Sequence, residues 1–315
     1  MKRLKPLLYL FFSVFSLAGC VSSKNTMAPP AKAIPLHDAL LWRIEGNGLR
    51  HPSYLFGTMH LIPAEDFFWP KGMEEAISNA DKMVFEIDMD KMSSPLVYLS
   101  VLSKSLMRND TTLKMLLSPE EYAEVSAQLK EKLGKIPFVE RVKPFFLSEL
   151  INMQEENAFS NKGNQMSYEK ELYRFAKEYH IKSDGLETVK QQMSYFDKIP
   201  YRLQAQMLLE SIRHDEEEET NRLLSLYRQQ KISALSALIR EDMPDNSVYA
   251  RVLLSDRNRR WVPIMAQYMR KGSILFAVGA GHLGGNNGLL ALLKASGYRL
   301  IPMSISRRKR NRIKL

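Results

Sequence analysis

Two histidines occur in the same short pattern, Gly-x-x-His-Leu, near opposite ends of the chain. The first copy contains Gly57 and His60, and the second contains Gly279 and His282. Each copy follows an apolar run that predicts a buried strand, so a glycine ends each strand and an imidazole follows three residues later. Glycine permits a positive φ and a close approach of backbone, and open α/β sheets bind ligands at the carboxyl ends of their strands. The pattern therefore predicts a metal site or a proton-transfer site at that edge.

Other segments occur between the two motifs in the order of a known family. These segments are Ser53-Tyr54-Leu55-Phe56-Gly57-Thr58-Met59-His60, Val84-Phe85-Glu86, Gly185-Leu186-Glu187-Thr188 with Gln192, Arg257-Asn258 before Trp261, Gly288-Leu289-Leu290 and Gly297-Tyr298. Over most of its length the chain resembles the TraB/PrgY/GumN family, which is related to the Tiki proteases. The resemblance implies a metal-dependent peptidase fold. Members also act in pheromone shutdown or are linked to haem, so the resemblance indicates the fold more firmly than the activity.

The candidate metal ligands are His60, His282 and Glu86. Two neutral imidazoles and a carboxylate suit a divalent transition metal such as Mn, Co, Zn or Fe, and a catalytic ion also needs an open position for water. Glu86 and Asp88 point to the same side of an extended strand, so the spacing leaves both open. The family resemblance favours Glu86. The remaining histidines are interpreted as ordinary hydrogen-bonding residues: His37, His51, His180 and His214.

Three further polar residues are candidates for catalysis: Glu187, Arg257 and Asn258. Glu187 follows an apolar run and precedes a helix, so it is a candidate general base or a partner of a histidine, and capping of that helix suits Thr188. Arg257 and Asn258 resemble the family's Arg-Asn pair. A permanently charged guanidinium can bind an oxyanion or a substrate carboxylate, while the amide orients a ligand. The alternative for Arg257 is simple pairing with Asp256 or with a helix end.

Residues 1–19 resemble a bacterial lipoprotein signal peptide, in which a basic start and an apolar run lead to Leu17-Ala18-Gly19-Cys20. The apolar run is shorter than the ~20 residues that cross a bilayer. Cys20 is the single cysteine of the chain, so acylation, for example by palmitate, leaves no thiol for a disulfide, a Cys-ligated zinc or a nucleophile. Because Val21 follows it, resemblance to the Gram-negative sorting rule favours the outer membrane, facing the periplasm.

The net charge of +10 does not point to nucleic acid. Three of the positive charges lie in the predicted signal peptide and six in the basic tail at 306–315, which leaves the body of the chain nearly neutral. A neutral body argues against a nucleic-acid-binding domain. The tail is interpreted either as a patch that contacts anionic lipid or lipopolysaccharide phosphates, or as a solvated terminus.

The hydrophobic pattern predicts an α+β (mixed α/β) fold in which strand-helix units from both ends of the chain share one sheet. From Ser118 to about Met269 the pattern is helical, and this middle is expected to cap the site. The expected elements are a hairpin of 40–44 and 53–56, a helix near 71–79, strands at 82–87 and from 274, a helix at about 288–295 and a strand at 298–305. The predicted divisions are the signal peptide (1–19), a lipidated tether (20–35), a TraB/GumN-like domain (36–305) and the basic tail (306–315).

These residues predict a peptidase anchored at the bacterial envelope that hydrolyses peptide bonds with a bound metal. A second interpretation is a non-catalytic envelope lipoprotein that uses the same histidines to bind a peptide or haem. A third is a lipoprotein that docks protein partners, with the polar segments serving only in packing. The sequence alone leaves these three open.

Overall fold

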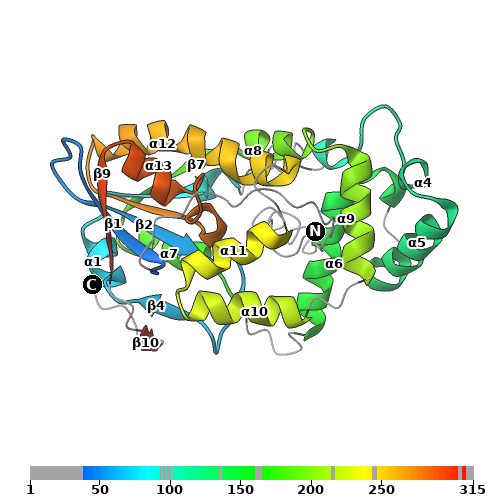
Figure 1. Ribbon diagram of the computed structural model, residues 1–315, viewed down its shortest axis with the longest axis horizontal. Helices are drawn as coiled ribbons and strands as arrows, with labels where there is room; N and C mark the ends of the chain where they lie inside the picture. The colour runs from blue at the N-terminus through cyan, green and yellow to red at the C-terminus, as the bar shows by residue number, and fades with distance from the viewer. Residues whose placement is uncertain are drawn as a thin grey trace, which may run out of the picture. The chain divides into compact units, whose positions relative to one another are not determined.

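The computed structural model describes residues 38–92, 94, 97, 101, 103–134, 137–159, 165–213, 217–242, 247–303 and 307–309. Two units form within the chain (Figure 1). The helical unit contains the described parts of 91–164 and 188–220, and the sheet unit contains the described parts of 21–90, 165–187 and 221–315. Apart from 307–309, all described residues lie within the domain predicted at 36–305.

A six-stranded sheet with the order β7-β5-β8-β2-β1-β9 forms the centre of the sheet unit. Strands β2, β8, β5 and β7 are mutually parallel, and β1 runs antiparallel to both of its neighbours, β2 and β9. The carboxyl ends of the four parallel strands therefore lie along one edge. The strands are β1 (Leu41–Gly46), β2 (Ser53–Thr58), β5 (Lys82–Ile87), β7 (Lys182–Glu187), β8 (Ile274–Gly279) and β9 (Tyr298–Pro302).

The predicted strands of the two chain ends are confirmed. Strands β1 and β2 form the expected hairpin, with Leu41 opposite Phe56, and Gly46, Asn47 and Gly48 all adopt the positive φ that this turn requires. Every residue of β2 and of β8 is buried. Such continuous burial is typical of parallel strands covered on both faces, and it explains why their sequences are apolar runs rather than alternating patterns.

Two strands that the sequence did not reveal lie within the helical middle, β6 (Gln165–Met166) and β7 (Lys182–Glu187). The expected apolar run before Glu187 is wrong, because β7 reads KSDGLE and Leu186 is its one apolar side chain; the strand was missed for the same reason. Pairing holds it in place instead: β7 pairs in parallel with β5 from Lys182 to Glu187. A Cβ at Gly185 would lie 2.3 Å from the backbone nitrogen of Asp88, so only glycine allows this close approach.

Helices cover both faces of this sheet. Figure 1 shows α12 and α13 along one face and α1 and α7 along the other. Helix α12 follows directly from a π-helical turn, η3, a feature often found at functional sites. The elements are α1 (Met73–Ser78), α7 (Tyr168–Glu178), α11 (Ile232–Asp242), η3 (Ala250–Ser255), α12 (Asp256–Met269), the 3-10 turn η4 (Ala280–His282) and α13 (Leu289–Ala295). Helices α2 (Met89–Met92) and α10 (Glu217–Arg228) each contain residues of both units.

Two short antiparallel pairs complete the sheet unit. Strand β3 (Ile62–Pro63) pairs with β6, and β4 (Phe68–Pro70) pairs with β10 (Arg307–Lys309). Strand β10 belongs to the segment predicted as a basic tail, so part of that segment is hydrogen-bonded to the fold, contrary to a wholly solvated terminus.

The helical unit packs α5, α6 and α9 against one another. A buried ion pair ties its two chain segments together, because Lys143 Nζ lies 2.6 Å from Asp197 Oδ1 and also binds the carbonyl of Lys104. Its elements are α4 (Leu113–Leu116), α5 (Pro119–Leu133), the 3-10 turn η2 (Val139–Arg141), α6 (Pro144–Phe159), α8 (Val189–Phe196) and α9 (Tyr201–Arg213). The mixed α+β class and the helical middle are confirmed, with the exception of β6 and β7.

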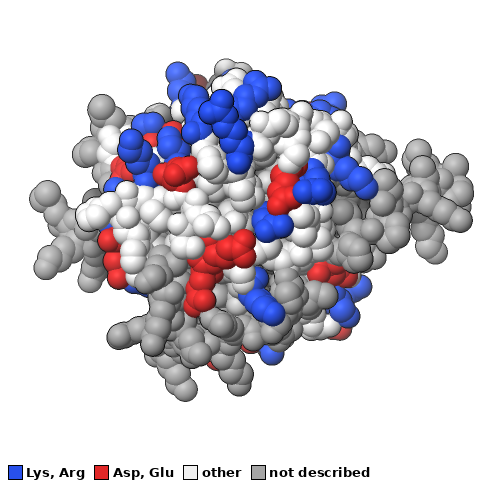
Figure 2. Space-filling view, turned by 90° about the vertical axis from the view of Figure 1, so that its left-hand side faces the viewer, with Lys and Arg blue, Asp and Glu red and all other residues white. Residues whose placement is uncertain are grey.

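The predicted signal peptide, the tether and Cys20 lie outside the described residues. Within the described part of the chain, no helix combines the length and the apolar character needed to cross a membrane. Lysines and arginines are interspersed with acidic side chains on the face seen in Figure 2. On the outer strands β1 and β9, Arg43 and Arg299 both pair with Glu45. That surface is therefore of mixed charge rather than a single basic field.

Candidate functional site

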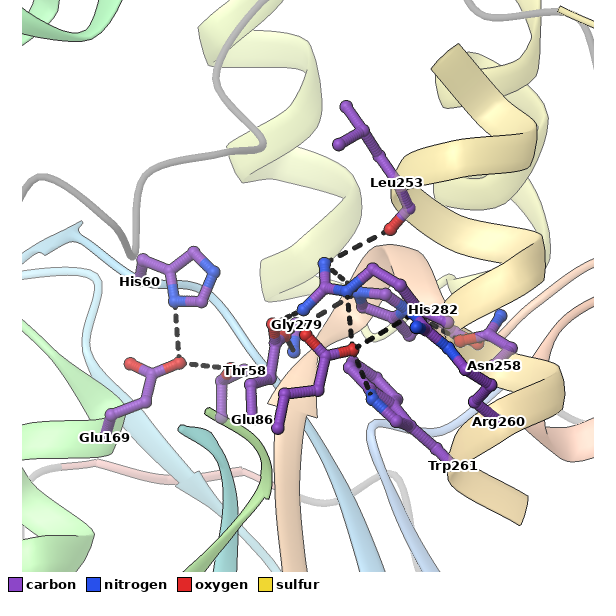
Figure 3. A network of polar contacts seen from close by, with 12 residues as sticks. Thr58, His60, Glu86, Glu169, Leu253, Asn258, Arg260, Trp261, Gly279 and His282 are labelled. Atoms are coloured by element: carbon purple, nitrogen blue, oxygen red, sulfur yellow. Dashed lines mark hydrogen bonds and ion pairs between the residues drawn. The ribbon is translucent and has the colours of Figure 1, made fainter. Parts of the chain in front are cut away.

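All six predicted catalytic and ligand residues lie together at the carboxyl edge of the sheet. The residues are His60, Glu86, Glu187, Arg257, Asn258 and His282. Figure 3 labels His60, Glu86, Asn258 and His282 among their neighbours. Two of the carboxylates end parallel strands, since Glu86 is the penultimate residue of β5 and Glu187 the last of β7. Every member belongs to the sheet unit, so one folded unit provides the whole site.

Neither motif glycine has a positive φ, and space restricts Gly57 more than Gly279. Gly279 has φ −51°, and Gly57 is absent from the residues with positive φ, so neither uses the positive φ that glycine permits. A Cβ at Gly57 would lie 2.9 Å from a methyl of Leu283. The two motifs also differ in position relative to the ends of their strands. Gly279 is the last residue of β8, whereas Gly57 is followed by Thr58, the last residue of β2.

Glu86 and Arg257 form the buried ionic centre of the network. Arg257 Nη2 donates to Glu86 Oε2 at 2.6 Å, and the backbone N–H of Gly279 donates to Oε1 at 2.9 Å. Burial favours the neutral acid, but the nearby guanidinium and imidazoles outweigh it and lower the pKa of Glu86 to about 2. Glu86 is therefore an anion at neutral pH. Asp88, the alternative, instead accepts the backbone N–H of Asp90 beyond the strand.

Glu187 shares the same arginine. Its Oε1 accepts Arg257 Nε at 3.0 Å and Trp261 Nε1 at 2.5 Å, whereas its buried Oε2 has no hydrogen-bond partner. Burial raises the pKa of Glu187 despite the opposing effect of Arg257. One oxygen is thus held and the other is available to carry a proton. Thr188 caps helix α8, as expected.

His282 is completely buried, and Asn258 determines its tautomer. The His282 Nδ1–H donates to Asn258 Oδ1 at 2.6 Å, and Asn258 Nδ2 donates to the carbonyls of His282 and Asn287. Nε2 therefore carries the lone pair, which faces Arg257 Nη1 at 3.3 Å and lies 3.7 Å from Glu86 Oε1. Burial lowers the pKa of His282 to about 3, so the ring is neutral.

The sequence offered pairing with Asp256 or with a helix end as the alternative for Arg257. Arg257 instead bridges Glu86 and Glu187, and its Nη1 also donates to the carbonyl of Leu253 in η3 at 3.2 Å. The neighbouring Arg259 pairs with Asp256 at 3.3 Å.

His60 is held by a residue that the sequence did not single out, Glu169. His60 Nδ1 lies 2.8 Å from Glu169 Oε1, which also accepts the hydroxyl of Thr58 at 2.5 Å. Burial favours the neutral ring, but the Glu169 carboxylate outweighs it and raises the pKa of His60. Glu169 lies in the first turn of helix α7, where acidic residues are common, so the sequence offers no signal that separates it from an ordinary helix-start acid.

The three predicted ligands converge on the backbone of Gly279. A Cβ placed there would lie 3.3 Å from Glu86 Oε1, 3.6 Å from His60 Nε2 and 3.8 Å from His282 Cδ2. Both histidines also use Nδ1 for an oxygen partner, as metal-bound histidines commonly do. By donor type, two imidazoles and a carboxylate suit a divalent transition metal, whereas His282 turns Cδ2 toward that Cβ position and Nε2 toward Arg257. Among the described residues, no three His, Cys, Asp or Glu side chains form a closed metal-binding cluster.

A surface pocket of about 360 Å³ lies at the opposite, amino-terminal edge of the sheet, beside Lys82 and Asp184. These two side chains pair with each other at 3.2 Å. The pocket is remote from the histidines, so its location does not define the candidate site. Of the histidines predicted to have no special role, His51 and His180 are exposed, and His37 and His214 lie outside the described residues.

Two comparisons with known proteins give a match. Residues 40–302 match the family model described as the TraB/PrgY/gumN family. Metalloprotease TIKI2 of Danio rerio is 22% identical over 345 residues, a match that covers 91% of this chain and 65% of that protein. The chain thus spans somewhat less than two thirds of the length of this relative. No solved structure matches the chain.

Proposed function

Because the chain belongs to the TraB/PrgY/gumN family, we propose that the network at the carboxyl edge of its sheet hydrolyses peptide bonds with a divalent transition metal, Mn, Co, Zn or Fe. The observation that carries the proposal is the convergence of His60, His282 and Glu86 on Gly279. The similarity to a metalloprotease supports the same reaction class. The substrate is a peptide or a protein.

His60, His282 and Glu86 would hold the ion. A bound ion of this kind lowers the pKa of a water molecule and polarises the carbonyl that the water attacks. Asn258 keeps the His282 Nε2 lone pair directed into the site. A cation at that nitrogen would take the lone pair that Arg257 now contacts.

Arg257 and Glu187 supply charge and proton transfer. A buried guanidinium stabilises negative charge that develops on a tetrahedral intermediate, because no water screens it. Glu187 Oε2 has no partner and lies in a buried position that favours its protonated form, so it can carry a proton to the leaving amine. The amide of Asn258 is occupied by hydrogen bonds to His282 and to the carbonyl of Asn287, so its role is orientation of the histidine rather than contact with an oxyanion.

The proposal is tested on the purified full chain by elemental analysis, an absorbance scan and cleavage of a fluorogenic peptide library with each added metal. We expect about one transition-metal ion per chain and metal-dependent cleavage, with both lost in His60→Ala and in His282→Ala because each removes a ligand. His180→Ala, at an exposed histidine, is the matched control. A Soret band would favour haem binding, and a metal-free, inactive wild type would reject the proposal.

We further propose that a lipid on Cys20 anchors the protein at the bacterial envelope, at the outer membrane facing the periplasm, with the basic segment near the C-terminus contacting anionic lipid. Cys20→Ser should abolish labelling by a fatty-acid probe and leave uncleaved precursor. Unchanged labelling and fractionation would contradict the anchor. Binding to vesicles with and without anionic lipid, for the chain with and without 310–315, tests the lipid contact separately.

A further inference from the structure

Glu169 is a buried carboxylate whose oxygens both face neighbouring donors. The residue is 3% exposed. Its Oε1 accepts from His60 Nδ1 and from the hydroxyl of Thr58, and Oε2 accepts from the hydroxyl of Ser167 at 3.1 Å. A buried carboxylate is costly unless its lone pairs are satisfied. These contacts offset the cost of burial and hold the carboxylate in a fixed orientation.

The backbone fixes the two segments that bring Glu169 and His60 together. Strand β3 begins two residues after His60, and β6 ends three residues before Glu169. The two strands pair, with Ile62 opposite Met166 and Pro63 opposite Gln165. The short β3–β6 pairing therefore holds the turn that carries His60 next to the start of helix α7.

A role limited to the helix dipole does not account for this arrangement. Acidic side chains near a helix N-terminus are stabilising even at the solvent-exposed surface. Glu171, in the same first turn, is such a residue: it is partly exposed and pairs with Arg174 at 2.9 Å. Glu169 is instead turned into the protein and toward the imidazole.

We propose that Glu169 is a positioning residue for His60. Its carboxylate binds the Nδ1–H and thereby turns Nε2 toward Gly279 and Glu86, where His60 Nε2 is 3.6 Å from the point that a Cβ at Gly279 would occupy. The purpose of this orientation rests on the proposed function, since an imidazole that is held at Nδ1 presents Nε2 to an ion or to water. The orientation itself can be measured without metal or substrate.

The test determines which ring nitrogen of His60 carries a proton. Long-range ¹H–¹⁵N NMR of the metal-free full chain, labelled with ¹⁵N-histidine, distinguishes the two neutral tautomers and the charged ring. We expect a protonated Nδ1 in the wild type. In Glu169→Leu, which has no acceptor, the neutral ring should shift to the Nε2–H form, whereas in Glu169→Gln the amide oxygen should retain the Nδ1–H. Glu171→Gln is the matched control, and the His282 signals should remain unchanged throughout.

A second readout is the affinity for Zn²⁺, measured by competition with a chelator. Loss of a partner that orients a metal-bound histidine typically weakens binding about 10- to 100-fold. We expect that loss in Glu169→Leu, a smaller loss in Glu169→Gln and none in Glu171→Gln, at matched melting temperatures. If Glu169→Leu does not fold, the role of Glu169 is decided by comparing the Zn²⁺ affinities of Glu169→Gln and Glu171→Gln. Weaker binding in Glu169→Gln supports the positioning role, and equal binding rejects it.

The outcomes separate this inference from the proposed function. A wild type that binds no Zn²⁺ and cleaves no peptide would reject the proposed function, while the tautomer measurement would still decide the role of Glu169. A His60 ring that keeps its Nδ1 proton in folded Glu169→Leu would overturn the positioning role. Equal Zn²⁺ affinity of wild type and both Glu169 variants would also overturn it.

Discussion

The two turns that carry the Gly-x-x-His motifs share a sequence pattern but differ in environment. The turn at Gly57 to His60 is called the first corner, and the turn at Gly279 to His282 the second corner. At the first corner, a carboxylate, Glu169, holds the ring of His60, and that ring is about a tenth exposed. At the second, a neutral amide, Asn258, holds the ring of His282, and a guanidinium faces its other nitrogen. The pKa of His60 is raised while that of His282 is lowered to about 3. The motif places an imidazole, and the surroundings of the ring set its charge: the Glu169 carboxylate raises the pKa of His60, whereas burial lowers that of His282.

This difference assigns the two histidines different chemistry. A ring beside a carboxylate can accept a proton and remain stable, whereas a fully buried ring beside a guanidinium remains neutral. His282 can therefore act only through its lone pair. His60 can act through its lone pair or by carrying a proton. Variants that change one corner but not the other test this interpretation.

The largest expected effect comes from Arg257, which belongs to the second corner. Arg257→Met leaves Glu86 and Glu187 buried without their cation, and breaking a buried ion pair from one side costs about 3–5 kcal/mol. We expect a loss of that size in urea unfolding. Arg259→Gln removes an exposed pair on the same helix and should change stability by less than about 0.5 kcal/mol. Similar losses of stability in Arg257→Met and Arg259→Gln would contradict the interpretation of Arg257 and its carboxylates as a buried ionic centre.

The next largest effect on stability distinguishes Gly57 from Gly279. Gly57→Ala places a methyl 2.9 Å from Leu283 and should cost about 1–3 kcal/mol through overpacking. In Gly279→Ala the closest atom, Glu86 Oε1, is 3.3 Å away, so the expected cost is below about 1 kcal/mol. The Gly279 methyl would instead fill the space between the imidazoles, and activity or metal binding should fall without a matching loss of stability. Equal unfolding free energies for both variants would show that the corners are sterically alike.

The sequence predicted the members of the site better than their roles. The histidines, Glu86, Glu187 and the Arg-Asn pair could be found because each lies at a strand end or in a family segment. That Arg257 would bridge two carboxylates was not predictable, because β7 lacks the apolar pattern that reveals a strand and was assigned to the helical middle. The end of β7 is what brings Glu187 to the arginine.

Glu169 shows a different limit. Its neighbours in sequence form an ordinary helix start, with Ser167 as the cap. Its contact with His60 spans 109 residues and depends on the two-residue strands β3 and β6. Strands this short leave no periodic signal. A partner that is brought in by such tertiary pairing can be recognised only in the folded chain.

A smaller effect is expected at Thr58, which belongs to the first corner alone. Thr58→Val keeps the side-chain shape but removes the hydroxyl that donates to Glu169 Oε1. The buried carboxylate loses one donor, so stability should fall by about 0.5–1.5 kcal/mol. In a combined Thr58→Val, Glu169→Leu variant, the cost of Thr58→Val should largely vanish because the acceptor is gone. Additive costs in this cycle would show that the hydroxyl stabilises the fold independently of Glu169.

The smallest expected effect tests the far end of helix α7, which carries Glu169 at its start. Lys177, Tyr173 and Ser183 all bind Asp90, and their hydrogen bonds lower its pKa to about 2 from an ordinary 3.8. A depressed carboxylate pKa stabilises the fold above pH 3.8, and this contribution is lost as the pH falls toward 2. Because Asp90 is nearly half exposed, solvent screening limits the contribution to less than about 1 kcal/mol. Asp90→Asn should therefore unfold slightly more easily than the wild type at pH 6, and the two unfolding curves should converge as the pH approaches 2. A difference that stays constant down to pH 2 would mean that the ionised Asp90 does not anchor the helix.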